Sequence, residues 1–182
     1  MSSQPTKPFQ DARELLKAHL ASAGPGPGIQ VANIVLTYRV SGGPPGKRLS
    51  LMVLMSSRGE VTYEHHDELH GQKPIRLKMT LPADETTSLL RQVEQSGILD
   101  VREAGAGFLP DSVIASIRIE SDGAQVTYNF LAEEHQQESQ NKAPLAPMRE
   151  LKLTFEDLCE EVRKTSTLKN SAARNKKNKG GG

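Results

Sequence analysis

The densest group of potential metal ligands in the chain is the run His65-His66-Asp67-Glu68-Leu69-His70. On a helix, His66 and His70 would share one face at a four-residue spacing and could together hold zinc. A zinc-protease helix also needs a glutamate directly after its first histidine, and Asp67 occupies that position here. The neighbouring residues instead predict a strand end followed by a loop, where this spacing sets no ligand geometry. We therefore interpret the run as a solvated loop and expect no metal or other cofactor.

The alternative hypothesis is a metal-dependent enzyme that uses His65, His66 and His70. Equilibrium dialysis that shows no tight zinc binding would remove it. A different reaction class, nucleophilic catalysis, finds little in the chain. Cys159 is the single cysteine, no histidine is close to it in sequence, and it falls near the apolar stripe of an expected helix. We expect an inert thiol there, in the core or at its boundary. No Gly-x-Ser-x-Gly elbow occurs either. These observations favour a protein that is not an enzyme.

A second motif, Gly42-Gly43-Pro44-Pro45-Gly46-Lys47, superficially resembles a phosphate-binding loop. The register of such a loop requires glycine where Ser41 stands and serine or threonine where Arg48 stands. The motif also lies between two expected strands, so no helix N-terminus follows it to bind phosphate. Proline fixes φ, so two adjacent prolines make the loop rigid. The pattern therefore predicts a stiff, exposed connection and not a nucleotide site.

Aromatic residues on strands could in principle stack on RNA bases. Tyr63, Tyr128 and Phe130 are the candidates, but the Lys/Arg-aromatic clusters of RNA-binding sheets are missing around them. We expect these three side chains to be part of the core.

Size and hydropathy set the broad class. A chain of 182 residues suggests one domain with tails, and its mean hydropathy of −0.51 lies toward the polar end for a compact protein. The longest apolar run, residues 49–55, is too short to span a bilayer, and the N-terminus lacks the apolar core of a signal peptide. A single cysteine excludes an internal disulfide and fits a reducing compartment. We expect a cytoplasmic protein with no membrane partner.

Charge is segregated along the chain. Seven basic residues and no acidic residue occur from Arg163 onward. The part of the chain before Arg163 contains the other sixteen basic residues and all 22 acidic ones, which gives it a net charge of −6. The body should repel nucleic-acid phosphates, and the tail should attract them. A basic tail of this kind usually gives solubility or weak nonspecific contact. Nucleic-acid binding by the tail is therefore a secondary expectation.

Alternation of apolar residues predicts the strands that must position these groups. Residues 29–40 are apolar on both faces, which predicts a central strand covered on two sides. A second strand is expected over about 48–55, a short one through Val61 and Tyr63, and a fourth over 75–81. Because the connections are short, these strands should form an antiparallel meander.

Helical spacing and turn residues complete the pattern. Apolar residues recur at helical spacing from Phe9 to about Ala23, before a Gly/Pro linker, and again from Met148 to Val162. A further helix is expected to start at Pro82 and to end at Gly97 in a left-handed cap, while Asp122-Gly123 predicts a tight hairpin. The fold class is therefore α+β, an antiparallel meander with helices on one face. Its expected parts are an N-terminal helix and linker (1–28), one domain (29–163) and a disordered basic tail (164–182).

The order of these signals carries a resemblance. The residues concerned are Tyr38-Arg39-Val40-Ser41-Gly42-Gly43 with Gly46, Leu81-Pro82-Ala83-Asp84-Glu85 with Leu89-Leu90, and Pro110-Asp111 ahead of Ser116-Ile117-Arg118-Ile119 and Asp122-Gly123. Over roughly residues 31–163 this order resembles the emfourins, small bacterial proteins whose founding member inhibits thermolysin-like metallopeptidases. The order of elements in this chain also resembles, over much of its length, that of a bacterial domain of unknown function.

The resemblance implies a non-enzymatic inhibitor that acts through the loop between the first two strands. Its expected partner-binding residues are Ser41, Gly42, Gly43, Pro44, Pro45 and Gly46. The chain departs from the family at Pro44-Pro45, where a bulky apolar residue commonly follows Gly-Gly. The alternative function is a scaffold or adaptor whose acidic body and basic tail engage another protein or nucleic acid.

Overall fold

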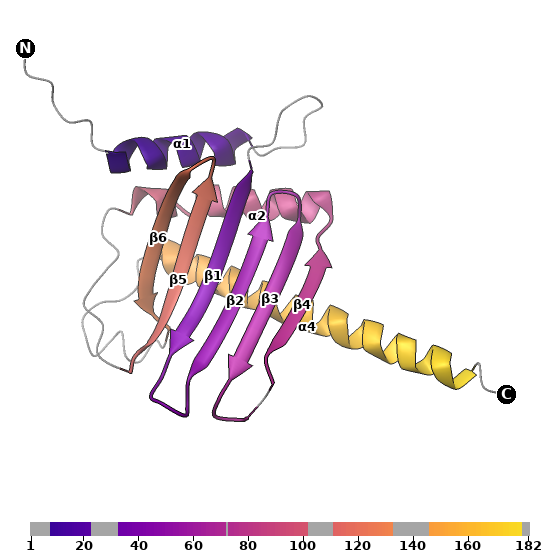
Figure 1. Ribbon diagram of the computed structural model, residues 1–182. Helices are drawn as coiled ribbons and strands as arrows, with labels where there is room; N and C mark the ends of the chain where they lie inside the picture. Colours follow the sequence, from indigo (N-terminus) through magenta and orange to yellow (C-terminus); the bar gives the residue numbers. More distant parts are fainter. Residues whose placement is uncertain (1–7, 23–32, 72, 102–110, 133–145, 180–182) are drawn as a thin grey trace, which may run out of the picture.

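The computed structural model describes residues 8–22, 33–71, 73–101, 111–132 and 146–179, and these form an α+β fold (Figure 1). A single antiparallel sheet has the strand order β4-β3-β2-β1-β5-β6. The elements in chain order are α1 (Pro8–Ser22), β1 (Ile34–Gly42), β2 (Leu49–Ser56), β3 (Glu60–Asp67), β4 (Ile75–Thr80), α2 (Ala83–Gln95), the 3-10 helix η1 (Ile98–Asp100), β5 (Val113–Ser121), β6 (Ala124–Leu131) and α4 (Ala146–Lys179).

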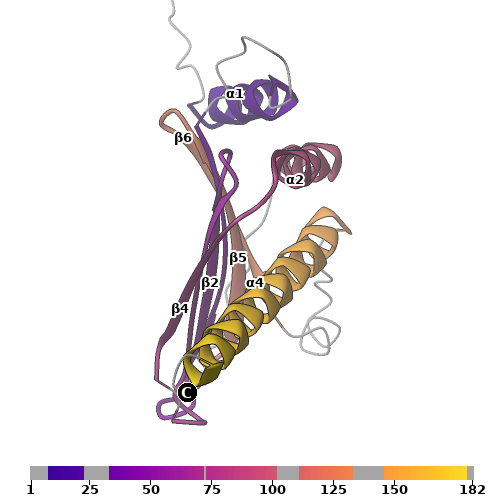
Figure 2. The ribbon, with the colours of Figure 1, turned by 90° about the vertical axis from the view of Figure 1, so that its right-hand side faces the viewer.

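Strand β1 is central, as its sequence predicts, because it pairs with β2 on one side and β5 on the other. The expectation that it is covered on both faces is wrong. Ile34, Leu36 and Tyr38 are buried on the face toward the helices, whereas Arg39 on the opposite face is exposed. Helices α1, α2 and α4 all lie on one side of the sheet (Figure 2). The sheet therefore has one covered and one uncovered face.

The core lies between the covered face and the helices. Helix α4 supplies the stripe that helical spacing predicts, with buried side chains at Met148, Leu151, Phe155, Leu158 and Val162. The Phe155 ring stacks on Tyr38, with ring centroids 5.4 Å apart.

The N-terminal helix is part of this core and not an appendage to it. Leu16 and Leu20 of α1 are buried in the same hydrophobic cluster as the sheet residues. The Lys17 ammonium also donates to the Asp100 carboxylate at 2.6 Å, which joins α1 to η1. Helix α2 is tied to α4 in turn, because the Gln92 amide donates to the Thr154 hydroxyl at 2.9 Å.

Local turns follow the sequence signals. Gly97 adopts the left-handed conformation with φ 72°, and the hairpin residues Asp122 and Gly123 have φ 47° and 84°, as a type I′ turn requires. Helix α4 extends through the basic segment to Lys179, past residue 164, where a tail was expected to begin. The linker expected before residue 29 lies outside the described residues.

Candidate functional site

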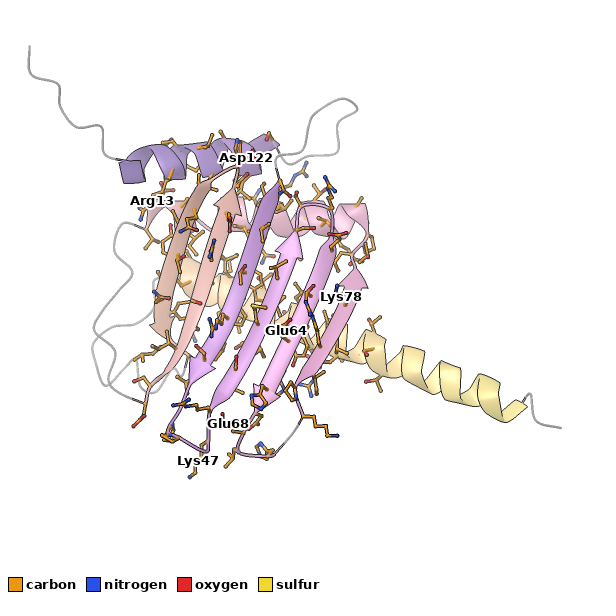
Figure 3. The ribbon with its side chains drawn as sticks, viewed as in Figure 1. Arg13, Lys47, Glu64, Glu68, Lys78 and Asp122 are labelled. Carbon is orange, nitrogen blue, oxygen red and sulfur yellow. The ribbon has the colours of Figure 1, made fainter. Side chains whose placement is uncertain are left out.

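The 41–46 loop leaves the sheet where β1 ends and carries the six residues expected to bind a partner. Ser41 and Gly42 are the last residues of β1, and they are half-buried together with Gly43. Pro44, Pro45 and Gly46 are exposed. The loop projects from the end of the sheet that carries Lys47 and Glu68, opposite the end that carries Asp122 (Figure 3). It is therefore open to approach by another molecule.

A hydrogen-bonded turn defines the tip of the loop. The Lys47 amide donates to the Pro44 carbonyl at 3.0 Å, and Gly46 has φ 77° at the third position of the turn. Proline at the second position and glycine at positive φ in the third are the signature of a type II turn. Pro45 and Gly46 fill those positions, so the local sequence selects this one backbone conformation.

The base of the loop leaves no room for side chains. A Cβ on Gly42 would lie 2.1 Å from the Ser112 carbonyl oxygen, and one on Gly43 would lie 2.7 Å from the Lys47 carbonyl oxygen. Both glycines also have positive φ, 140° and 97°. The sequence pattern identified the two prolines as stiffening residues. The role of the two glycines, which permit close backbone packing, appears only in the folded structure.

A second loop supports the first from the side. The Glu68 amide, in the turn after β3, donates to the Arg48 carbonyl at 3.0 Å. That turn is closed by His70, whose Nδ1 lies 2.6 Å from an Asp67 carboxylate oxygen. The hydrogen bond from His70 lowers the pKa of the Asp67 carboxyl. The two loops thus share one end of the sheet.

The histidine run does not form the solvated loop that its polarity suggested. His65 and His66 belong to β3, which continues to Asp67, because residues 49–55 of β2 provide pairing partners for the whole segment. Successive residues of a strand point to opposite faces, so these two histidines diverge. Within the described ranges, no group of three or more His, Cys, Asp or Glu side chains could hold a metal ion.

One group of a serine, a histidine and an aspartate could not be recognised from the sequence, because its members are far apart in the chain. The Nδ1 atom of His19 lies 2.9 Å from the Ser121 hydroxyl and 3.9 Å from an Asp122 carboxylate oxygen. A Ser-His-Asp triad needs serine on one ring nitrogen and aspartate on the other, whereas both contacts here involve Nδ1. Ser121 is also fully buried. These residues fasten α1 to the β5–β6 hairpin and are not arranged for catalysis.

The remaining candidates are in the core. Tyr63, Tyr128 and Phe130 are buried beneath the helices, as expected, and present no ring for base stacking. Cys159 is also buried, and burial raises the pKa of its thiol to about 12. A thiol with this pKa is a poor nucleophile at neutral pH.

Comparisons with known proteins assign no family to the chain. No family model matches it, and no curated protein matches it. Among solved structures, it is similar to an SsgA-like sporulation-specific cell division protein from Thermobifida fusca YX-ER1, at 10% sequence identity and a TM-score of 0.18. That match covers 70% of this chain and 95% of the other. None of the helices in the described parts of the chain is long and apolar enough to cross a membrane.

Proposed function

We propose that this chain is a non-enzymatic protein-binding domain that presents the 41–46 loop to a partner, and specifically that it inhibits a thermolysin-like metallopeptidase in the cytoplasm. The observation that carries the proposal is the combination of exposure at Pro44, Pro45 and Gly46 with a hydrogen-bonded type II turn. The resemblance of the loop and its flanking elements to the emfourins supplies the peptidase class.

Rigidity favours this role because an ordered loop loses little conformational entropy when it binds. Fixing the backbone of one flexible residue costs about 1–2 kcal/mol. Here the fixed φ of two prolines, the turn hydrogen bond and the close packing at Gly42 and Gly43 have already fixed the backbone. A loop of this kind can enter a cleft without rearranging.

The test is inhibition of thermolysin, measured as hydrolysis of a peptide substrate at increasing concentrations of the full chain. We expect dose-dependent loss of peptidase activity. Replacing Pro44 and Pro45 by glycine should raise the inhibition constant about 4- to 30-fold, because each glycine adds about 0.4–1 kcal/mol of backbone entropy to be lost. Unchanged peptidase activity at micromolar wild-type protein rejects the peptidase assignment.

A matched control comes from the opposite end of the sheet. The Asp122→Asn variant keeps a residue that tolerates positive φ in the type I′ turn, and it lies far from the 41–46 loop (Figure 3). It should inhibit as the wild type does. Equal loss of inhibition in this control and in the glycine variant would point to a general folding defect and not to the loop.

A further inference from the structure

The sheet face turned away from the helices is a surface of the molecule that the 41–46 loop does not use. No described element lies over it, and Figure 3 shows Glu64 and Lys78 on this side. The strand registers assign its central residues. We call these residues the open face: Thr37, Arg39, Met52, Leu54, Ile114 and Ser116.

Arg39 occupies the middle of the open face. It lies on the central strand, directly opposite Met52 of β2 on one side and Ser116 of β5 on the other. Its side chain is exposed, whereas Met52 is half-buried. Both residues line a surface hollow of about 480 Å³ that extends toward β4.

The Arg39 guanidinium differs from its neighbours in having no carboxylate partner. Arg76 pairs with Glu64 at 3.0 Å, and Arg118 pairs with Glu120 at 2.6 Å, on either side of it. Among the described residues, no ion pair involves Arg39. The two residues opposite it, Met52 and Ser116, carry no charge. An unpaired fork of N–H donors beside a hollow matches the geometry of an incoming carboxylate.

The residues around Arg39 add apolar contact to this charge. Met52, Leu54 and Ile114 lie on the same face and are half-buried, so part of each side chain stays open to a partner. Serines and threonines flank them and supply hydroxyl groups. Such a surface fits an extended peptide in which carboxylates alternate with apolar side chains.

We propose that the open face is a docking surface for an extended acidic segment of a partner protein, with Arg39 binding one of its carboxylates. Glu64 also lines the hollow, but it is paired with Arg76, and Glu120 is paired with Arg118, so both carboxylates are already neutralised and Arg39 remains for the peptide. The occupant is a peptide and not a nucleic acid because the tyrosines of the sheet are buried on the other side, where their rings cannot stack on bases.

This inference does not depend on peptidase inhibition. The test uses a labelled, C-terminally amidated peptide of alternating glutamate and valine, and a matched peptide with glutamine in place of glutamate. Binding to the full chain is followed by fluorescence anisotropy at low ionic strength, where charge pairing is least screened. We expect the glutamate peptide to bind and the glutamine peptide not to bind.

Variants locate the binding. Arg39→Gln should weaken binding of the glutamate peptide about tenfold or more, because a charge-assisted hydrogen-bonded pair is lost, and Arg39→Lys should weaken it less. Arg58→Gln is the control, since Arg58 is also exposed but lies in the turn between β2 and β3, at one end of the strands. It should bind as the wild type does.

Each other outcome overturns the proposal. These outcomes are no binding of the glutamate peptide at millimolar concentration, equal binding of the glutamine peptide, and an Arg39→Gln variant that binds as tightly as the wild type. A labelled single-stranded oligonucleotide that binds more tightly than the peptide and depends on Arg39 would assign the open face to nucleic acid instead.

Discussion

At the scale of single residues, Gly42 and Gly97 both have positive φ, but only Gly42 also has another backbone segment packed closely against it. Gly42→Ala should destabilise the fold by about 2 kcal/mol or more, because it combines an unfavourable φ with a Cβ placed 2.1 Å from the Ser112 carbonyl oxygen. Gly97→Ala meets open space and should cost only about 1 kcal/mol for the left-handed conformation. Urea unfolding of both variants measures the difference. Equal costs would show that the neighbouring Ser112 backbone yields.

Cys159 should make the stability of the fold depend on alkaline pH. The pKa of its thiol is raised from the ordinary value of 9.0 to about 12. Burial is the main cause, and the charge of nearby Glu156 is the second. Above pH 9 the unfolded chain releases the thiol proton while the folded chain keeps it. The unfolded state then binds fewer protons, so the unfolding free energy falls as the pH rises through this window and is fully retained below it.

The Cys159→Ala variant isolates this contribution. Burial also raises the pKa of Tyr38, Tyr63 and Tyr128, but their ordinary value is 10.0, so their effect begins at higher pH. Between pH 9 and 10, unfolding free energy from urea titrations should fall more steeply for the wild type than for the variant. Parallel curves over that interval would mean that the folded thiol titrates normally.

Residue types predicted the fate of buried groups better than that of polar ones. Cys159 and Tyr128 are buried as their apolar neighbours in sequence indicated. His65 and His66 were misplaced in a loop because polar residues carry little β-strand signal of their own. Their strand is set by pairing with residues 49–55, a long-range contact that local sequence does not encode.

At the scale of elements, α1 tests whether a segment beyond the sheet is part of the fold. Leu16 is fully buried, whereas its neighbour Leu15 is 41% exposed. Leu16→Ala should lower the unfolding free energy by about 2–5 kcal/mol because a core cavity is left. Leu15→Ala should change it by less than about 0.5 kcal/mol. Thermal and urea unfolding give both values, and similar small changes would mean that α1 does not dock in solution.

Element positions were predictable where the pattern was periodic or the turn chemistry was specific. The apolar stripe of α4 and the Asp122-Gly123 hairpin are confirmed for those reasons. The packing of α1 was not predictable, because a modest apolar face does not say what it meets. The inner residues of β4 are also less buried than their alternation suggested, with Ile75 40% exposed, because an edge strand has a neighbour on one side only.

Part of the candidate site could be predicted from the sequence and part could not. Pro45 and Gly46 predict a turn, and the structure has that turn. Arg39 gave no signal, because an arginine at a period-two position of a strand is what any solvated face contains. It becomes notable only when the register shows that the residues directly opposite it are uncharged and that Arg76 and Arg118 on the same face are paired. Spatial isolation of a charge is a property of the assembled sheet.

At the scale of the whole molecule, the separation of charge underlies the alternative role as a scaffold or adaptor. The chain has a net charge of +1, but the part before Arg163 has a net charge of −6. Helix α4 carries the basic residues away from the sheet (Figure 1). Attraction to polyanions should therefore come from the end of α4, while the acidic remainder opposes it.

Ending the chain at Arg163 tests this division. The deletion removes six basic residues but keeps Val162, so the packed stripe of α4 stays intact. The melting temperature should hardly change, because the ion pair lost, Lys164 with Glu160, is exposed. Retention on a phosphate-bearing matrix at low salt should disappear, whereas the full chain should be retained and eluted by added salt. Salt-independent retention of the full chain, or retention of the shortened one, would place polyanion binding elsewhere and remove the basis for this role.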